Sequence, residues 1–275
     1  MRKKTLLLFL LAASVMATGG CRKKSQEKMD LTSTHTTAVE TMSPETTAAE
    51  TEVSTEAEET TQAANASAGV SGSTKIETYH PKDFPTGSIS YPVVAHMKDE
   101  AKQNQVNDLL YENAISICDS LDLKNMDYLT IDCKVVSLDT SRITVVYQGE
   151  YYVKQGAYPV QIFYANTVDL NQVKSLGIND YSDAYTMAGY LMSDDVRFVD
   201  ADPKLTSSLW DYRSDQSIDY FTDLLNKADF PSKTKDASIF PESFSYLSNS
   251  TLYFSIPVPH ALGDYAIVAY PMDGK

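Results

Sequence analysis

Few side chains in this sequence are spaced as a catalytic or metal site requires. Three of the four histidines, His80, His96 and His260, lie beyond residue 75. None of them stands four positions from another, as zinc ligands on a helix do. Ser232-Lys233-Thr234-Lys235 has the S-x-x-K spacing of a serine acyl-transfer site, but no S-D-N or K-T-G follows it. The sequence therefore predicts no catalytic residue, no metal ligand and no cofactor.

Acidic residues outnumber basic ones, at 37 Asp and Glu against 23 Lys and Arg, giving a formal net charge of −14. Nucleic acid is excluded as a partner, because phosphate neutralisation needs a basic surface. A cationic partner fits this charge, and so does a surface selected only for solubility. Four acidic residues lie close together in the sequence: Asp194, Asp195, Asp200 and Asp202. They could form a calcium site that lacks the usual glycine-centred loop, or they could belong to a solvated surface.

The N-terminus has the features of an export signal. Arg2, Lys3 and Lys4 precede an apolar run over residues 6–15, which is too short to be a transmembrane helix. The following segment, residues 18–21, resembles the lipobox of bacterial lipoproteins and ends in Cys21. We expect a signal peptide over residues 1–20, a lipid on Cys21, and a chain held at the outer face of the cytoplasmic membrane. The alternative is an ordinary secreted protein in which Cys21 has no special role.

A stalk is expected between the lipid anchor and the folded part. No Lys or Arg occurs from Met29 to Thr74, and Thr, Glu, Ala and Ser dominate this stretch. Such a segment cannot bury enough apolar surface to offset the entropy lost on ordering. We therefore predict a disordered stalk over residues 21–86, followed by an α+β domain over residues 87–275.

Three consecutive β-strands form the centre of the predicted domain, over residues 129–136, 142–153 and 158–168. The first alternates apolar and polar residues, and the others are rich in β-branched and aromatic residues. Short turns between them favour an antiparallel meander. A helix over residues 99–120 carries an apolar stripe that can pack on this sheet.

The remaining elements complete an α+β fold, an antiparallel β-sheet with packed helices. Residues 89–94 read as a strand, and Pro92 within it favours an edge position. Helical patterns cover residues 179–192 and 214–228, and short strands are expected at residues 243–246, 251–258 and 265–270. Cys118 and Cys133 are interpreted as buried thiols, with a disulfide as the alternative in an exported domain.

Tyrosines gather on the two strands that form the second hairpin of the meander. The two interpretations are ordinary strand packing and a recognition surface, because tyrosine is favoured in both. Trp210 with Tyr212 is a second candidate anchor for a partner. The hairpin tyrosines are Tyr147, Tyr151, Tyr152, Tyr158 and Tyr164.

Several short motifs over residues 88–270 resemble one known family. They include Gln105-Val106-Asn107, the strand residues 147–152, and Pro257-Val258-Pro259-His260 followed by Gly263-Asp264-Tyr265. Together these resemble the extracytoplasmic domain shared by a lysozyme-responsive anti-sigma factor and the non-catalytic region of certain peptidoglycan deacetylases. The glycine-rich turn of that family falls at residues 154–159, where Gly156-Ala157 is retained.

The resemblance implies envelope sensing or protein binding, with lysozyme as the partner in the anti-sigma factor. We accordingly place the candidate partner-binding residues on the hairpin and its turn, and expect a membrane-anchored lipoprotein that binds a lysozyme-like protein or peptidoglycan and catalyses no reaction. The alternatives are a cell-wall-modifying hydrolase and a structural component of an envelope assembly. The candidate residues are Tyr151, Tyr152, Gln155, Gly156 and Tyr158.

Overall fold

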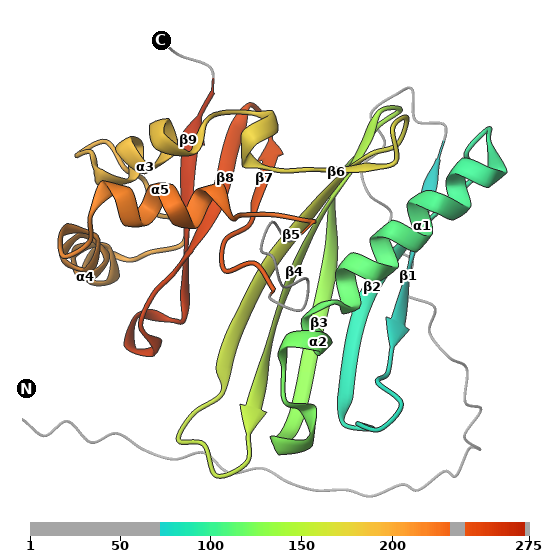
Figure 1. The fold of residues 1–275 in the computed structure, drawn as a ribbon, viewed down its shortest axis with the longest axis horizontal. Coiled ribbons are helices and arrows are strands. Elements are labelled where there is room, and N and C mark those ends of the chain that lie inside the picture. The colour runs from blue at the N-terminus through green and yellow to red at the C-terminus, as the bar shows by residue number, and fades with distance from the viewer. Residues whose placement is uncertain (1–71, 232–239, 273–275) are drawn as a thin grey trace, which may run out of the picture. The chain divides into compact units, whose positions relative to one another are not determined.

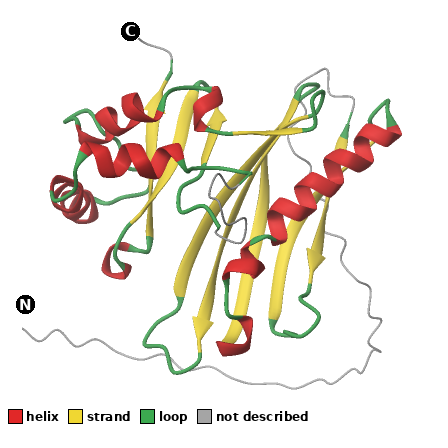
Figure 2. Cartoon of the chain, in the orientation of Figure 1, coloured by secondary structure: helices red, strands yellow, loops and turns green. Residues whose placement is uncertain are grey.

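The structure, a computed structural model, describes residues 72–231 and 240–272. The predicted signal peptide, Cys21 and the first part of the predicted stalk lie outside the described residues, as does the S-x-x-K segment at residues 232–235. Within the described ranges, none of the helices combines the length and the apolar character needed to cross a membrane. The fold is α+β, as the sequence predicts, and contains two β-sheets (Figures 1 and 2).

The larger sheet has six strands in the order β1-β2-β3-β4-β5-β6. The predicted meander forms its centre, with β3 (Met126–Leu138), β4 (Arg142–Val153) and β5 (Val160–Asp169) paired antiparallel. β6 (Lys174–Leu176) is a short strand at one edge that the sequence did not predict. In this register Cys133 lies opposite Tyr147, and Tyr147 lies opposite Tyr164.

The start of the sheet corrects three predictions. β1 (Ser73–Tyr79) pairs antiparallel with β2 (Gly87–Ala95), so ordered structure begins inside the range expected to be stalk, residues 21–86. β2 is therefore an inner strand, and Pro92 lies opposite Ile76. The sheet is mixed and not purely antiparallel, because β2 and β3 run parallel from Gly87 to Ile89. Two parallel neighbours need a crossover, and the helix between them supplies it.

That crossover is α1 (Glu100–Ile115), which lies across the sheet (Figure 1). Its cap is Asp99, whose side chain accepts a hydrogen bond from the Lys102 N–H at 3.0 Å. The predicted single helix over residues 99–120 is two helices, α1 and the one-turn α2 (Ile117–Ser120). The buried side chains of α1 that face the sheet core are Val106, Leu110 and Ala114.

Asn107 of α1 takes the place of a strand partner for β2. Its Oδ1 accepts a hydrogen bond from the Val94 N–H at 2.8 Å, and its Nδ2 donates one to the Val94 carbonyl at 2.9 Å. The β2–β3 pairing ends at Ile89, so this part of β2 has no neighbouring strand on that side. The side-chain amide therefore satisfies backbone groups that a ladder would otherwise satisfy.

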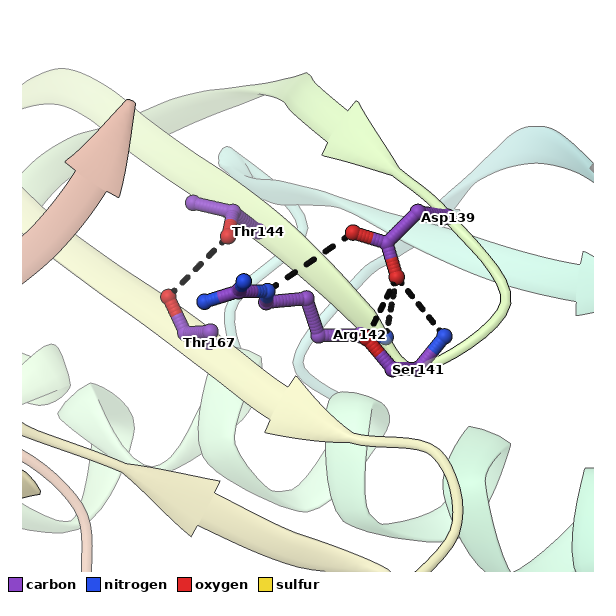
Figure 3. A network of polar contacts seen from close by, with 5 residues as sticks. All are labelled: Asp139, Ser141, Arg142, Thr144 and Thr167. Atoms are coloured by element: carbon purple, nitrogen blue, oxygen red, sulfur yellow. Dashed lines mark hydrogen bonds and ion pairs between the residues drawn. The ribbon is translucent and has the colours of Figure 1, made fainter. Parts of the chain in front are cut away.

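The turn between β3 and β4 is held by Asp139 (Figure 3). One carboxylate oxygen accepts hydrogen bonds from the Ser141 N–H at 2.7 Å and the Arg142 N–H at 2.9 Å. Further along β4, the buried hydroxyls of Thr144 and Thr167 lie 3.2 Å apart across the β4–β5 pair. These contacts fix the register of the meander at its upper end.

The smaller sheet is antiparallel and consists of β7 (Ser245–Ser248), β8 (Thr251–Pro257) and β9 (Tyr265–Pro271). It shares a second hydrophobic core with α3 (Ala184–Met192), α4 (Pro203–Ser214) and α5 (Ile218–Asn226). α4 was not predicted, although Asp202 caps it and Pro203 occupies its first turn, two signals that mark a helix start.

Asp229 connects the segments around this second core. The residue is 2% exposed, and its carboxylate accepts hydrogen bonds from the Ile178 N–H at 2.7 Å, the Ser245 N–H and the Ser245 hydroxyl. A buried carboxylate needs such donors to offset the loss of water. Asp229 thereby fixes the end of α5 to β7 and to the 3₁₀ turn at Ile178–Asp180.

Candidate functional site

The hairpin tyrosines divide into packing residues and surface residues. Tyr147 and Tyr164 are fully buried and stack on each other, with ring centroids 4.4 Å apart and 6° between the planes. The Tyr164 hydroxyl donates to the Ala114 carbonyl at 2.7 Å. Burial raises the pKa of both phenols well above the usual value. These two tyrosines therefore belong to the core, as the packing interpretation predicts.

Tyr152 organises the turn between β4 and β5. Its ring stacks on Tyr128 at 6.1 Å, and its hydroxyl donates to the Gly156 carbonyl at 2.6 Å. The Gly156 N–H donates to the Val153 carbonyl at 2.8 Å, and Gln155 is exposed with a positive φ of 62°. Three of the five candidate residues thus lie together, Tyr152 at the end of β4 and Gln155 and Gly156 in the turn, and the contacts of Tyr152 and Gly156 hold the turn's conformation.

Tyr151 is half-buried at the end of β4, opposite Val160, and packs against the larger core. Burial raises the pKa of Tyr151, and the nearby Asp264 carboxylate raises it further. Since Asp264 follows Tyr151 by more than a hundred positions, this proximity is produced by the fold alone. Adjacent residues on a strand point to opposite faces, which separates Tyr151 from Tyr152.

Tyr158 is exposed, with 66% of its surface accessible. Its ring stacks on the imidazole of His260, with centroids 5.3 Å apart and 24° between the planes. His260 Nδ1 lies 3.0 Å from Asp264 Oδ1, at hydrogen-bond distance. The aromatic side chain is therefore held at the surface by a residue of the β8–β9 connection.

The geometry of that connection explains how His260 and Asp264 meet. The chain forms a 3₁₀ turn at His260–Leu262 and then enters the left-handed region at Gly263, with φ of 104°, and Asp264, with φ of 68°. The Gly263 N–H donates to the His260 carbonyl at 3.0 Å. Glycine and aspartate tolerate this conformation better than other residues. The turn thereby brings Asp264 back to the imidazole.

Asp264 also joins this connection to the larger sheet. Its Oδ2 accepts a hydrogen bond from the Gln161 N–H at 2.8 Å, and Gln161 Nε2 donates to Glu150 Oε2 at 2.8 Å. The Tyr128 hydroxyl donates to the other oxygen of Glu150 at 2.7 Å. The hydrogen bonds from Tyr128 and Gln161 lower the pKa of Glu150. We call this connected set the hairpin face; it consists of Tyr128, Glu150, Tyr158, Gln161, His260 and Asp264.

Sequence reasoning found Tyr158 but did not identify its neighbours as site residues. His260 and Asp264 occur in the motifs that carry the family resemblance, yet nothing in the sequence places them against the β4–β5 hairpin. Glu150 also lies in one of those motifs, but Gln161 carried no signal, because a polar residue on a strand is usually only solvent-facing. The hairpin face combines an exposed aromatic ring, an imidazole and two carboxylates, groups that suit a ligand with positive charge or hydrogen-bond donors.

Two other hypotheses concern metals and thiols. In the part of the chain that the structure describes, no three His, Cys, Asp or Glu side chains are grouped so as to hold a metal ion. Asp194 instead pairs with Arg213, and Asp202 caps α4, so the calcium interpretation is wrong for these two residues. Cys118 and Cys133 are free thiols but only half-buried, so the interpretation as buried thiols is correct for the free state and overstates the burial; partial burial raises their pKa values to about 11 and about 12.

No protein-family model matches the chain, and no curated protein matches it significantly. Among solved structures, a DUF3298 family member from Bacteroides fragilis is 15% identical, with a TM-score of 0.33. A DUF3298 family protein from Pseudomonas aeruginosa is 9% identical, with a TM-score of 0.39. Both alignments cover 73% of this chain and 88% of the other chain.

Proposed function

We propose that this chain is an extracytoplasmic lipoprotein that binds or senses a partner of the cell envelope and catalyses no reaction. In this proposal the lipid on Cys21 anchors the chain to the outer face of the cytoplasmic membrane, and the hairpin face contacts the partner. The export signal predicted at the N-terminus and the lipobox-like segment support the location.

The observation that carries the proposal is the exposed ring of Tyr158 fixed on His260. An exposed tyrosine is usually mobile, and ordering it on binding costs free energy. Here the stacking on His260 orders the ring in advance, and the hydrogen bonds of Asp264 order the imidazole. A rigid aromatic side chain linked through His260 to the Asp264 carboxylate is suited to a lysine or arginine side chain.

A cationic protein of the lysozyme type has such side chains and is the partner that we propose. The net charge of −14 would also accelerate the encounter at low ionic strength. Peptidoglycan is the second partner to test, because the stalk would hold the domain near it. Nucleic acid does not fit this charge.

The experiment is a calorimetric titration of the chain, carrying Cys21→Ser to remove the lipid acceptor, against lysozyme and against soluble peptidoglycan fragments. We expect lysozyme to bind, and Tyr158→Ala to weaken binding by about tenfold or more, the effect of a hot-spot residue. Tyr185→Ala is the matched control, since Tyr185 is 62% exposed but belongs to α3. Equal affinity of the Tyr158→Ala and Tyr185→Ala variants would reject the hairpin face as the binding surface.

The hydrolase alternative has one observation in its favour, the His260–Asp264 pair. A carboxylate on Nδ1 orients an imidazole as a general base in serine and cysteine hydrolases. Among the described residues, however, no serine, threonine or cysteine hydrogen-bonds the other ring nitrogen of His260. Release of muropeptides from purified cell walls, abolished by His260→Ala, would favour this alternative over binding.

A further inference from the structure

A second surface, on α4, combines an aromatic ring with polar side chains, as ligand sites do. It shares no residue with the hairpin face. A shallow depression of about 550 Å³ lies beside the helix, within the size range of ligand sites. Its lining residues are Ala201, Pro203, Thr206, Ser207, Trp210 and Asp211. The helical residues among them recur at three- and four-residue intervals, so they form one stripe of α4.

Trp210 is the only tryptophan of the chain, and 36% of its surface is exposed. The guanidinium carbon of Arg213 lies 5.0 Å from the centre of the indole ring. Arg213 is only 4% exposed and does not line the depression. The indole is thus supported by a buried cation while part of its surface stays open to solvent.

Arg213 is itself fixed in place, which makes the indole a rigid platform. Its Nη1 donates a hydrogen bond to the Leu191 carbonyl at 2.9 Å, in the last turn of α3. Its Nη2 lies 3.8 Å from Asp194 Oδ1. A guanidinium is favoured at the carboxyl end of a helix, where carbonyl groups lack partners. The orientation of Trp210 is therefore set before any ligand arrives.

Polar groups beside the indole are available to a ligand. Within the described residues, the side chains of Ser207 and Asp211 form no hydrogen bond or ion pair, and neither does the indole N–H. The Thr206 hydroxyl donates to the Ala201 carbonyl at 3.3 Å and keeps its acceptor capacity. The depression thus offers a flat aromatic surface bordered by hydroxyl, carboxylate and N–H groups.

Charge restricts the kind of ligand that fits this arrangement. Arg213 already makes the cation–π contact of the indole, and a second cation stacked on this ring would be repelled by its guanidinium, even though Asp211 at the rim would attract it. An anion would be repelled by Asp211 and by the net charge of −14. The ligand that avoids both repulsions is neutral, with one apolar face and a rim of hydroxyl groups. A sugar ring has this composition, since its C–H groups can pack on the negative face of an aromatic ring.

We propose that the α4 surface around Trp210 binds a saccharide chain, with one sugar ring stacked on the indole and its hydroxyl groups bonded to Ser207 and Asp211. This inference goes beyond the function proposed for the hairpin face and does not depend on it. α4 lies outside the motifs that carry the family resemblance, so the resemblance does not supply the site.

The test uses the fluorescence of Trp210, which reports on this site alone because the chain has no other tryptophan. A chitin tetrasaccharide is titrated into the chain with excitation that tyrosine does not absorb. We expect a saturable change of the emission, and at least a tenfold weaker affinity for Asp211→Asn combined with Ser207→Ala. Asp215→Asn, at the C-terminal end of α4, is the matched control and should bind as the unchanged chain does.

Trp210→Ala removes the fluorescent reporter, so its binding is measured by calorimetry, with the melting temperature as the check on folding. A folded Trp210→Ala variant that still binds the tetrasaccharide as tightly as the unchanged chain would overturn the proposal. Absence of any saturable emission change would overturn it as well. The same holds if a lysine-rich peptide changes the emission and the tetrasaccharide does not. Lysozyme binding through Tyr158 is unaffected by each of these outcomes, so the two proposals fail separately.

Discussion

Tyr158 and His260 stack with their ring centroids 5.3 Å apart, although about a hundred residues separate them in the chain. One belongs to the β4–β5 turn of the larger sheet and the other to the β8–β9 connection of the smaller sheet. The contact is backed by the Gln161 N–H, which donates to Asp264 at 2.8 Å. The two turns therefore form a single surface feature, and its rigidity depends on both.

The first prediction concerns how His260 acts on Tyr158. His260→Ala should weaken lysozyme binding about as much as Tyr158→Ala, because it frees the tyrosine ring that it now orders. His260→Phe should restore most of the affinity, since a phenyl ring can stack in the same place. Calorimetric titration measures both. Failure of His260→Phe to restore binding would show that the imidazole contacts the partner directly.

The second prediction concerns Asn107, which completes the backbone pairing of β2. Asn107→Ala should lower the free energy of unfolding by about 1–3 kcal/mol, because the Val94 N–H and carbonyl lose their partner. Urea denaturation measures the change. Asn104→Ala, at an exposed position of the same helix, is the control and should change the stability by less than about 0.5 kcal/mol. Equal effects of the two variants would contradict this role for Asn107.

The third prediction concerns the buried carboxylate of Asp229. Asp229→Asn should cost about 2–3 kcal/mol, because one oxygen is replaced by an NH₂ group that faces the donors of Ile178 and Ser245. Asparagine suits the test, since the position has a positive φ of 66° that asparagine tolerates. Asp223→Asn, on the exposed side of α5, is the control. A near-neutral Asp229→Asn variant would show that the carboxylate is not needed there.

The fourth prediction concerns stability in acid. Burial raises the pKa of Asp139, but the hydrogen bonds from Ser141 and Arg142 outweigh it, and the net pKa is lowered. A carboxyl whose pKa is lowered by folding stabilises the fold above its unfolded value, about 3.9. This contribution disappears as the pH falls through the lowered folded value. Urea denaturation between about pH 5 and pH 2 should show a smaller loss of stability for Asp139→Asn than for the unchanged chain.

Asp122→Asn is the control for the acid experiment, since its side chain makes no capping hydrogen bond. Its stability should vary with pH as that of the unchanged chain does. The same pH dependence in the Asp139→Asn variant would show that the β3–β4 turn does not contribute to acid unfolding.

The fifth prediction concerns the thiols. With pKa values raised by burial to about 11 and about 12, Cys118 and Cys133 should react slowly with a thiol reagent at pH 8. For Cys118, roughly one thiol in a thousand is ionised at that pH, and the thiolate is the reactive form. A chain carrying Cys21→Ser should therefore label slowly when native and rapidly in urea. Rapid labelling of the native chain would contradict the raised pKa values of these half-buried thiols.

Local sequence patterns were sufficient for much of the larger sheet. Alternating residues in β3, the β-branched run of β4 and the turn residues around Asp139 specified the meander, because period-2 patterns and turn chemistry act over a few residues. The same patterns do not predict α4, although Asp202 caps it. The helix buries only Leu209 and Arg213, so its sequence lacks a clear apolar period. It also missed β1, whose strand pattern was assigned to the stalk.

The sequence by itself determined the acidic character, the α+β class and the hairpin that carries Tyr158, and it predicts the export signal and the lipid anchor. The tertiary structure decided which residues surround that tyrosine, and it also decided that β2 runs parallel to β3. These results depend on contacts between residues far apart in the chain, such as Gln161 with Asp264 and Val94 with Asn107. Local patterns carry no information on such contacts, because the free energy that selects them comes from packing the whole domain.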